Sequence, residues 1–280
     1  MTGATAAGPL HVPVDPALAG LLTLLVALLG LAVGSFVNVV VWRLPRGESL
    51  SRPPSACPGC GRRVAPRDNV PVVSWLALRG RCRACGMRIS TRYPLVEAGT
   101  AVLFVAVAAR FGLDPGGAWA LPAFWYLAAV AVALALIDID THRLPDRIVL
   151  PSYLVGLVLL AVASAATGDW AALVRGVVGA AVLWTAYFAM VLAYPTGMGF
   201  GDVKLAGVLG LHLGWVGWGA LAVGAFAAFV LGGVFAVGLL VTGRASRTSG
   251  IPFGPWMLVG AAAGVVVGEP LWAAYLGLLV

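Results

Sequence analysis

Residues 131–140 read AVALALIDID, an apolar run that ends at the acids Asp138 and Asp140. The whole chain is similarly rich in apolar residues: 61% of its residues are hydrophobic and only 10% are charged. In soluble domains about half of the residues are apolar and about a quarter are charged. The mean hydropathy of +0.97 agrees with these fractions. The composition excludes an ordinary soluble protein and predicts a polytopic membrane protein, in which an acid that ends an apolar run lies at the membrane boundary.

Long apolar runs define the expected membrane helices. A helix needs about 20 residues to cross about 30 Å of hydrocarbon at about 1.5 Å per residue. Such runs predict helices at 17–42, 94–112, 119–137, 148–166, 172–194, 215–241 and 253–278, with a shorter one at 203–213. The expected fold class is an all-α polytopic membrane protein with about eight transmembrane helices. The short segment is glycine-rich, so a re-entrant segment or half of a bent helix stays open there.

One stretch differs in composition from the rest of the chain. Residues 43–93 are polar and proline-rich and contain eleven arginines, which predicts a small domain outside the lipid. The expected division is an amino-terminal segment with the first transmembrane helix at 1–42, this domain at 43–93, and a transmembrane domain at 94–280. The first helix is expected to be retained, because residues 1–16 lack the basic region of a signal peptide and no cleavage site follows the apolar run.

The arginines also predict the orientation of the chain. Short loops rich in positive charge stay in the cytoplasm, which places 43–93 there. Counting crossings places the loops near 138–147, 195–202 and 242–252 on the same side, together with Arg143, Arg147, Lys204, Arg244 and Arg247. Arg110 and Arg175 are expected on the other side. Topology and anionic lipid therefore explain the net charge of +7 without a nucleic-acid partner.

The four cysteines form two CxxC pairs inside the 43–93 domain. Cys57 and Cys60 lie in CPGCG, and Cys82 and Cys85 lie in CRACG. Four thiolates in paired knuckles match a tetrahedral structural zinc site, and a reducing cytoplasm argues against disulfides. Redox pairs are the alternative, but the flanking strand and helix that they use are missing from the sequence pattern. We expect a zinc-ribbon-like clip for a loop with little core of its own, and no grip on nucleic acid, because aromatic residues are few.

A second acid lies at a membrane boundary in GMGFGD, residues 197–202. The glycines let another chain approach closely, and Asp202 then precedes an apolar segment. Counting crossings puts Asp138 and Asp202 on the same face. Two carboxylates from different helices can share a proton there, with the ionised one acting as base and the protonated one as acid toward water and a peptide carbonyl. The alternative is that both acids are only helix caps or solvated boundary residues.

Five motifs, in this order along the chain, resemble the GxGD-type aspartic peptidases that process type IV prepilins, and in particular the two-activity prepilin leader peptidase/N-methyltransferases. The motifs are GSFVNVVVWRLP at 34–45, the two CxxC knuckles, RYPLVE at 92–97, DIDTHRLPD at 138–146, and GFGD at 199–202 followed by VKL. The resemblance runs from about residue 20 to the end of the chain. GxGD alone would be a weak signal, whereas five motifs in order are specific.

The resemblance implies that Asp138 and Asp202 are the catalytic pair. Asp140 is the rival for the first position, and Asp138 is preferred because the motif aligns through Pro145. The resemblance further implies an endopeptidase that cuts the short basic leader of type IV prepilins or pseudopilins after a glycine. The reaction would take place at the cytoplasmic face of the bacterial inner membrane, where a substrate with a hydrophobic helix presents its scissile bond.

The two-activity members then methylate the new amino terminus with S-adenosylmethionine. Resemblance alone assigns this methyl transfer to Gly34, Asn38, Arg43 and Glu97, because the sequence lacks a strand followed by a glycine-rich turn and a helix. Helix packing for Gly34, a cap for Asn38 and lipid-phosphate contact for Arg43 are the alternatives. Glu97, near the start of a membrane helix, should have a partner.

Other functions compete with these expectations. The methyltransferase region could be inactive in a chain that is a peptidase only. A proton-coupled transporter should carry its acids near the middle of the bilayer on broken helices, and a zinc-ribbon scaffold would leave the two acid motifs unexplained. The expected partners are the prepilin or pseudopilin and membrane lipid, with the oligomeric state left open. The basic leader is expected to bind acidic side chains and not the arginines, and the candidates are Asp140, Asp146 and Glu97.

Overall fold

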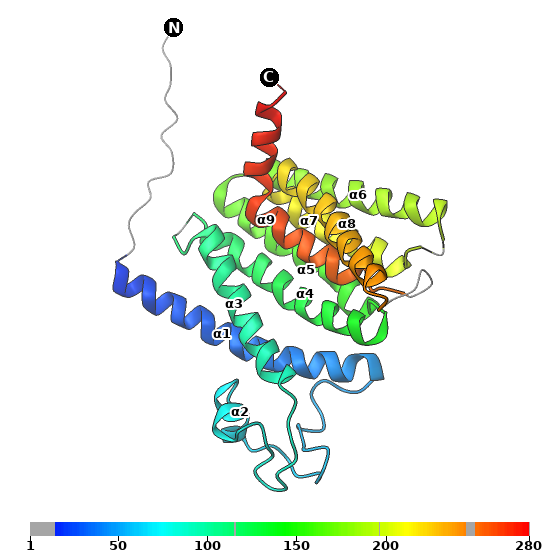
Figure 1. Ribbon diagram of the computed structural model, residues 1–280. Coiled ribbons are helices and arrows are strands. Elements are labelled where there is room, and N and C mark those ends of the chain that lie inside the picture. Colours follow the sequence, from blue (N-terminus) through cyan, green and yellow to red (C-terminus); the bar gives the residue numbers. More distant parts are fainter. Residues whose placement is uncertain (1–14, 115, 196, 245–249, 280) are drawn as a thin grey trace.

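The computed structural model describes residues 15–114, 116–195, 197–244 and 250–279, so the predicted loop cation Arg247 lies outside the described residues. Eight long helices form a bundle (Figure 1). They are α1 Pro16–Arg43, α3 Arg92–Phe111, α4 Leu121–Thr141, α5 Asp146–Thr167, α6 Trp170–Ala193, α7 Phe200–Val216, α8 Trp218–Val241 and α9 Gly254–Gly277. The prediction of an all-α polytopic membrane protein is confirmed.

Short elements lie outside the long helices. The helix α2 Val73–Ala77 belongs to the small domain, and the 3-10 turns are η1 Leu44–Arg46, η2 Pro66–Asp68 and η3 Ala118–Ala120. Within the described residues, β-structure is limited to two isolated bridges, both beside the cysteine pairs. Among the described residues, the apolar core is therefore built mainly from helices, with loop side chains such as Leu144 packed against it.

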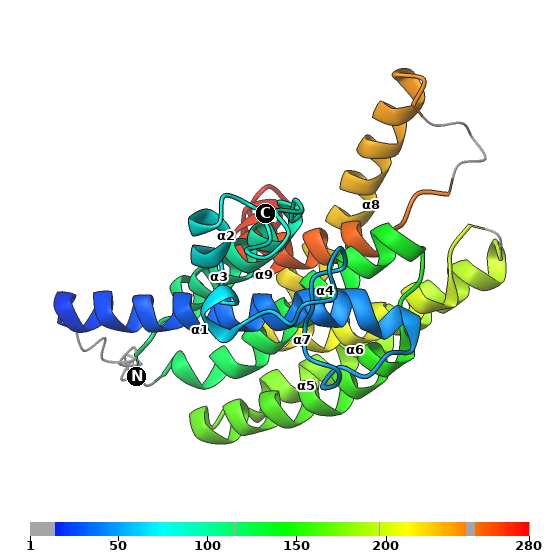
Figure 2. The same ribbon diagram turned by 90° about the horizontal axis from the view of Figure 1, so that it is seen from below.

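Seven of the long helices are long and apolar enough to cross a membrane, and α7 is the one that falls short of that length. It is nevertheless a single uninterrupted helix of 17 residues, about 25 Å at about 1.5 Å per residue, and is longer than the predicted 203–213. Nearly all its side chains from Asp202 to Gly214 are buried. The neighbours α5, α6, α8 and α9 cover it (Figure 2), so α7 is the centre of the bundle.

Glycines bring pairs of helices into close contact. A Cβ atom at Gly214 of α7 would lie 2.6 Å from the carbonyl oxygen of Arg175 on α6. A Cβ at Gly260 of α9 would lie 2.6 Å from the backbone nitrogen of Ala228 on α8. Small residues commonly allow such approaches between membrane helices. Glycine contacts of this kind hold α6 against α7 and α8 against α9. Glycines of α1 also pack closely against α3.

One end of the bundle gathers the acid motifs. The helix α4 ends at this end, and α5, α7 and α9 begin there (Figure 1). This places DIDTHRLPD beside GFGD.

At the carboxyl end of α7, Arg175 donates hydrogen bonds from Nε to the carbonyl of Gly214 at 2.8 Å and from Nη2 to that of Trp215 at 2.9 Å. A cation is favourable at a helix carboxyl terminus, which gives Arg175 a structural role.

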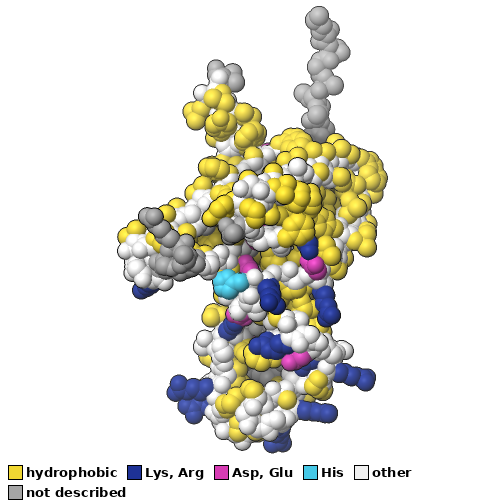
Figure 3. Space-filling model, turned by 90° about the vertical axis from the view of Figure 1, so that its right-hand side faces the viewer, with side chains coloured by type: hydrophobic (Ala, Val, Ile, Leu, Met, Phe, Trp, Pro, Cys, Tyr) yellow, Lys and Arg dark blue, Asp and Glu magenta, His cyan; other side chains and the backbone are white. Residues whose placement is uncertain are grey.

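The segment between α1 and α3 forms the small domain. It lies to one side of the bundle, next to α1 and α3 (Figure 1). Basic side chains are spread over its surface (Figure 3). The segment thus lies outside the helix bundle, and its definition as a separate domain stays a prediction.

Candidate active site and metal site

Asp138 lies in the last turn of α4 and is 5% exposed. Its neighbours Leu134 and Ile137 face the core, which draws this side of the turn inward. The helix ends at His142, which adopts left-handed φ and ψ of 52° and 40° and donates its N–H to the carbonyl of Asp138 at 2.8 Å. The carboxylate Oδ2 accepts a hydrogen bond from the N–H of Gly254, the first residue of α9, at 3.1 Å.

Asp202 lies in the first turn of α7 and is 9% exposed. Its Oδ2 accepts the N–H of the N-cap residue Gly199 at 3.1 Å, and its own N–H donates to the Gly199 carbonyl at 3.0 Å. The carboxylate thus caps the helix, as the structural alternative expected. Among the described residues, Oδ1 of Asp202 has no hydrogen-bond partner, so capping leaves one oxygen free for chemistry.

Leu144 connects the two acid-bearing segments. A Cβ at Gly201 of α7 would lie 3.1 Å from the Leu144 Cβ, and a Cβ at Gly254 of α9 would lie 3.3 Å from its Cδ2. The loop after α4 therefore packs between the beginnings of α7 and α9. Asp138 and Asp202 therefore belong to segments that meet at this leucine. Two carboxyls that lie close together favour a state in which only one of them is ionised.

Two neighbouring acids are engaged in ion pairs instead. Asp140 receives two hydrogen bonds from Arg92 at the start of α3, at 3.0 and 2.7 Å. Asp146, at the start of α5, receives two from Lys204 Nζ, at 2.7 and 2.9 Å. Both acids have exposed side chains, of which 38% and 54% is accessible. Asp140, the rival for the first catalytic position, is thus paired at the surface, whereas Asp138 is buried.

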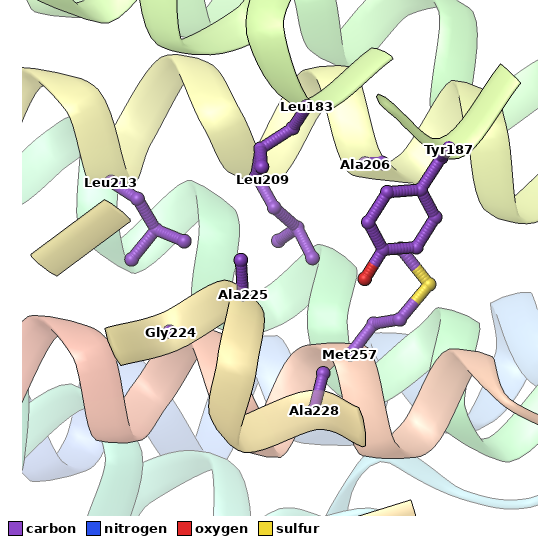
Figure 4. A pocket seen from close by; sticks show the side chains of 9 residues that line it. All are labelled: Leu183, Tyr187, Ala206, Leu209, Leu213, Gly224, Ala225, Ala228 and Met257. Atoms are coloured by element: carbon purple, nitrogen blue, oxygen red, sulfur yellow. The ribbon is translucent and has the colours of Figure 1, made fainter. Parts of the chain in front are cut away.

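A small cavity lies next to the face of α7 that carries Asp202. Its volume is about 10 Å³ and it is bounded by α6, α7, α8 and α9. Leu183 and Tyr187 reach into it from α6, and Met257 from α9 (Figure 4). The walls are almost entirely apolar, so this space is too small and too dry to hold a substrate.

The residues predicted for methyl transfer lie along the crossing of α1 and α3. A Cβ at Gly34 would lie 2.7 Å from the Cα of Glu97. Asn38 Nδ2 donates to the Tyr93 carbonyl at 3.2 Å. The structure therefore brings Gly34, Asn38 and Glu97 together. Their contacts here are within the protein, so their assignment to the methyl donor stays a prediction.

Arg43, the fourth residue of that prediction, is turned toward the small domain. Its Nη1 donates to the Ser49 carbonyl at 2.9 Å and its Nη2 to the Pro53 carbonyl at 2.7 Å. These bonds hold the chain where it leaves α1. In this structure the guanidinium of Arg43 therefore organises a loop.

Glu97 is buried in the second turn of α3, with 8% of its surface exposed. Its Oε2 accepts the backbone N–H of Val72, from the small domain, at 2.7 Å. The expectation that an acid at this place has a partner is met by this bond. Asp140 and Asp146 form ion pairs. All three acids proposed to bind the basic leader therefore have a partner within the protein.

The four cysteines form one cluster. The Sγ atoms of Cys57, Cys60, Cys82 and Cys85 all lie within 4.8 Å of one another, and those of Cys57 and Cys85 are 3.7 Å apart. Zinc–sulfur bonds of about 2.3 Å in a tetrahedron give sulfur–sulfur distances of about 3.8 Å. All four are free thiols. The donor set and its spacing fit a metal ion in a tetrahedral site.

The two knuckles are built alike. Cys57 N–H donates to the Arg62 carbonyl at 2.9 Å, and Cys82 N–H donates to the Met87 carbonyl at 2.8 Å. The antiparallel bridges 56–63 and 81–88 close each turn. Each knuckle ends in a glycine, Gly61 at φ 68° or Gly86 at φ 73°, because the turn needs a left-handed residue there. This explains the glycine after each CxxC.

The backbone of the second knuckle prepares a thiolate. Hydrogen bonds from the backbone of Cys85 and Ala84 lower the pKa of Cys82 to about 6. A thiolate, and not a thiol, is the form that binds a metal. The knuckle therefore favours the metal-binding form of Cys82 near neutral pH.

A groove of about 660 Å³ runs between α3 and α4. Ser90, Thr91 and Arg92 line one part of it, and the remainder is mainly apolar. No sequence pattern predicted this groove, because its walls come mainly from two helices that are each apolar over most of their length. Gly254, the donor to Asp138, was not among the predicted site residues. Its local signal is its position between Pro252 and Pro255 ahead of an apolar run.

Family models and curated relatives match most of the chain. Residues 28–111 match the model of the bacterial peptidase A24 N-terminal domain, and residues 125–237 match that of the type IV leader peptidase family. The chain is 39% identical to a prepilin leader peptidase/N-methyltransferase of Pseudomonas putida, over 91% of this chain and 94% of that protein. It is 37% identical to a protein of the same description from Aeromonas hydrophila, over 90% and 93%. No solved structure matches the chain.

Proposed function

The chain belongs to the type IV leader peptidase family, and we propose that it is a membrane-embedded aspartic endopeptidase that removes the short basic leader of type IV prepilins or pseudopilins. One observation carries the proposal. Two buried acids, Asp138 and Asp202, lie on different helices whose ends pack together around Leu144 at one end of the bundle. The similar proteins from Pseudomonas and Aeromonas carry a prepilin leader peptidase name, which supports the substrate class.

The proposed reaction uses the two carboxyls in opposite protonation states. The ionised carboxylate takes a proton from water while the new carbon–oxygen bond forms at the scissile carbonyl. The protonated carboxyl gives its proton to that carbonyl oxygen. The carboxyl that took the water proton then gives it to the leaving nitrogen as the carbon–nitrogen bond breaks, and a hydroxyl of the intermediate returns its proton to the other carboxylate. The backbone N–H groups of Gly254 and Gly199 hold one oxygen of each acid, so the pair needs little rearrangement.

We place the reaction at the cytoplasmic face of the bacterial inner membrane. The small domain carries most of the arginines, and loops rich in positive charge stay inside. Asp138 and Asp202 lie at helix ends and not at the middle of a span, which disfavours the alternative of a proton-coupled transporter. A substrate with a hydrophobic helix and a cytosolic leader presents its scissile bond, after a glycine, at that depth.

We further propose that the enzyme methylates the new amino terminus. S-adenosylmethionine, the donor implied by the family, supplies a methyl group on sulfur that is transferred to the amine nitrogen. Glu97 is the residue of this chain best placed to accept the proton that the amine loses, because it is a buried carboxylate beside Gly34 and Asn38. A peptidase without methyltransferase activity is the alternative.

The small domain is proposed as a structural zinc clip. Cys57, Cys60, Cys82 and Cys85 would hold the ion, since four thiolates in a closed tetrahedron are typical of structural zinc. The ion would stabilise a domain that has little apolar core of its own. We retain the division into 1–42, 43–93 and 94–280, in which the clip separates the first helix from the peptidase domain.

The direct test is to incubate the purified, membrane-reconstituted protein with a purified prepilin, with and without S-adenosylmethionine, and to weigh the product. We expect a mature pilin without its leader, and one added methyl group only when the donor is present. The matched control is Asp202→Asn protein that is inserted to the same level. An intact prepilin with the unmodified enzyme would refute the peptidase. A cleaved pilin that stays unmethylated in the presence of the donor would support the peptidase and refute the methyltransferase.

A further inference from the structure

A strained turn lies in the small domain at Val72. This residue has φ 61° and ψ −50°, and the N–H of Val73 closes the turn on the Pro71 carbonyl at 2.6 Å. Positive φ is rare for a β-branched residue, because its side chain collides with the backbone. Such strain persists where the surrounding structure imposes it and is concentrated at functional sites.

The turn presents its N–H to a buried acid of the membrane helix α3. Val72 N–H donates to Glu97 Oε2 at 2.7 Å. On the other side of Glu97, α1 approaches at Gly34, where any side chain would meet the Glu97 backbone. Hydrogen bonds to a charged acceptor in a poorly solvated place are stronger than neutral ones. Val72 therefore fixes one oxygen of a carboxylate whose backbone is already confined.

The segment around the turn is itself firmly held. Val70 N–H donates to Ser74 Oγ at 3.0 Å, and this hydroxyl donates to the Arg67 carbonyl at 3.0 Å. Trp75 Nε1 donates to the Ile89 carbonyl at 3.2 Å. The segment also runs between the two cysteine pairs. The turn is thus anchored locally as well as at both ends by the cysteine cluster.

We propose that Val72 is a positioning residue for Glu97, holding Oε2 so that Oε1 receives the amine of the newly formed pilin amino terminus. Among the described residues, Oε1 has no hydrogen-bond partner. The proposal rests on the methyl transfer proposed above. Val72 acts through its backbone N–H, so the side chain can be removed without loss, whereas the donor cannot.

The test compares proline and glycine at this position. Val72→Pro removes the donor and, because proline fixes φ near about −65°, also the positive φ of the turn. Val72→Gly keeps the donor and accepts positive φ without strain. We expect kcat for methylation of an already cleaved pilin to fall about tenfold or more in Val72→Pro, as for a lost charge-assisted hydrogen bond, and to stay near the unmodified value in Val72→Gly. Cleavage should be unchanged in both. Val70→Pro is the matched control, because it removes a neighbouring donor that does not reach Glu97.

A double-mutant cycle separates positioning from general damage. If Val72 acts through Glu97, then Val72→Pro should cost little more in a Glu97→Gln background, whereas unrelated damage would add. Equal losses in Val70→Pro and Val72→Pro, or additive losses in the cycle, would overturn the proposal. A methylation rate unaffected by Glu97→Gln would also overturn it, and would at the same time refute the proposed role of Glu97.

A measurement independent of turnover guards against a Val72→Pro protein that does not fold. In the unmodified chain, the amide of Val72 should be protected from hydrogen exchange by its bond to Glu97. Glu97→Ala should speed exchange in the peptide covering 70–76 by about tenfold, with the bound metal retained. Unchanged exchange would show that the bond does not hold the turn, and would overturn the proposal even if the enzyme did not methylate.

Discussion

The acid pair of the bundle and the single acid of the α1–α3 crossing are held in the same way but by different parts of the chain. Each buried carboxylate accepts one backbone N–H. For Asp138 and Asp202 the donors stand at the starts of the membrane helices α9 and α7. For Glu97 the donor is Val72, in the domain that carries the cysteines.

This difference separates what each site depends on. The helices around Asp138 and Asp202 pack through apolar side chains and glycines, so that region needs no metal to keep its shape. The loop that reaches Glu97 is short of apolar core and is fixed at the cysteine cluster. We therefore expect cleavage to tolerate the loss of the metal and methylation to be sensitive to it.

The largest effect is expected at the acid pair. Asp138→Asn and Asp202→Asn should each lower the cleavage rate by about a thousandfold or more, because one carboxyl cannot serve as both acid and base. Methylation of an already cleaved pilin should remain, measured by mass spectrometry of its amino terminus. Loss of both activities with normal membrane insertion would contradict the separation of the two regions.

A smaller but large effect is expected at Gly254. A Cβ there would lie 2.7 Å from Asp138 Oδ2, so Gly254→Ala must displace the carboxylate, and a misplacement of this kind costs about a hundredfold in rate. Gly233→Ala on α8 is the control, since a Cβ at Gly233 meets nothing within 4 Å. The measurement is the cleavage rate of the two variants, which should fall for Gly254→Ala and stay unchanged for Gly233→Ala. Equal rates for both would mean that the position of the Asp138 carboxylate beside residue 254 does not matter for the reaction.

The cysteine cluster should show the opposite pattern. Cys57→Ser removes one ligand of a closed site, so the purified protein should lose its zinc, about one ion per chain in the unmodified enzyme. Methylation should then fall about tenfold, because the loop no longer holds Val72 against Glu97, while cleavage changes little. Metal analysis and the two assays on one preparation test this. An equal fall in the cleavage and methylation rates would contradict the claim that only the region around Glu97 depends on the metal.

Apolar runs long enough to cross a bilayer predicted all the long helices of the described residues except α7. The segment 203–213 was predicted too short, because glycines dilute its hydrophobicity, whereas the burial of α7 depends on those glycines allowing α6 to approach. The helix α4 continues through Asp138 to Thr141, past the predicted end at 137, because polar side chains can complete a final helical turn at a membrane boundary. Helix ends are decided by capping and contact, which hydropathy does not describe.

The residues of the candidate sites divide in the same manner. Regular spacing made the cysteines recognisable, and motifs singled out Asp138 and Asp202. The donors to Asp138 and Glu97 left no such pattern, because Gly254 is 116 positions from Asp138 and Val72 is 25 from Glu97. A backbone N–H can come from any residue except proline, so its partner is set by tertiary structure alone.

The smallest effect is expected at Asp140, two residues from Asp138 and open to the same substitution. Its bonds to Arg92 join side chains that are 38% and 40% exposed, and an exposed ion pair contributes roughly 0–1 kcal/mol. Asp140→Asn should therefore change cleavage by less than about fivefold, measured beside Asp138→Asn in the same membranes. Because the two variants differ only in which acid loses its charge, a failure of insertion cannot mimic the contrast. If Asp140→Asn abolished cleavage while Asp138→Asn kept it, the surface acid would be the catalytic one, and the buried pair would be only an arrangement of helix caps.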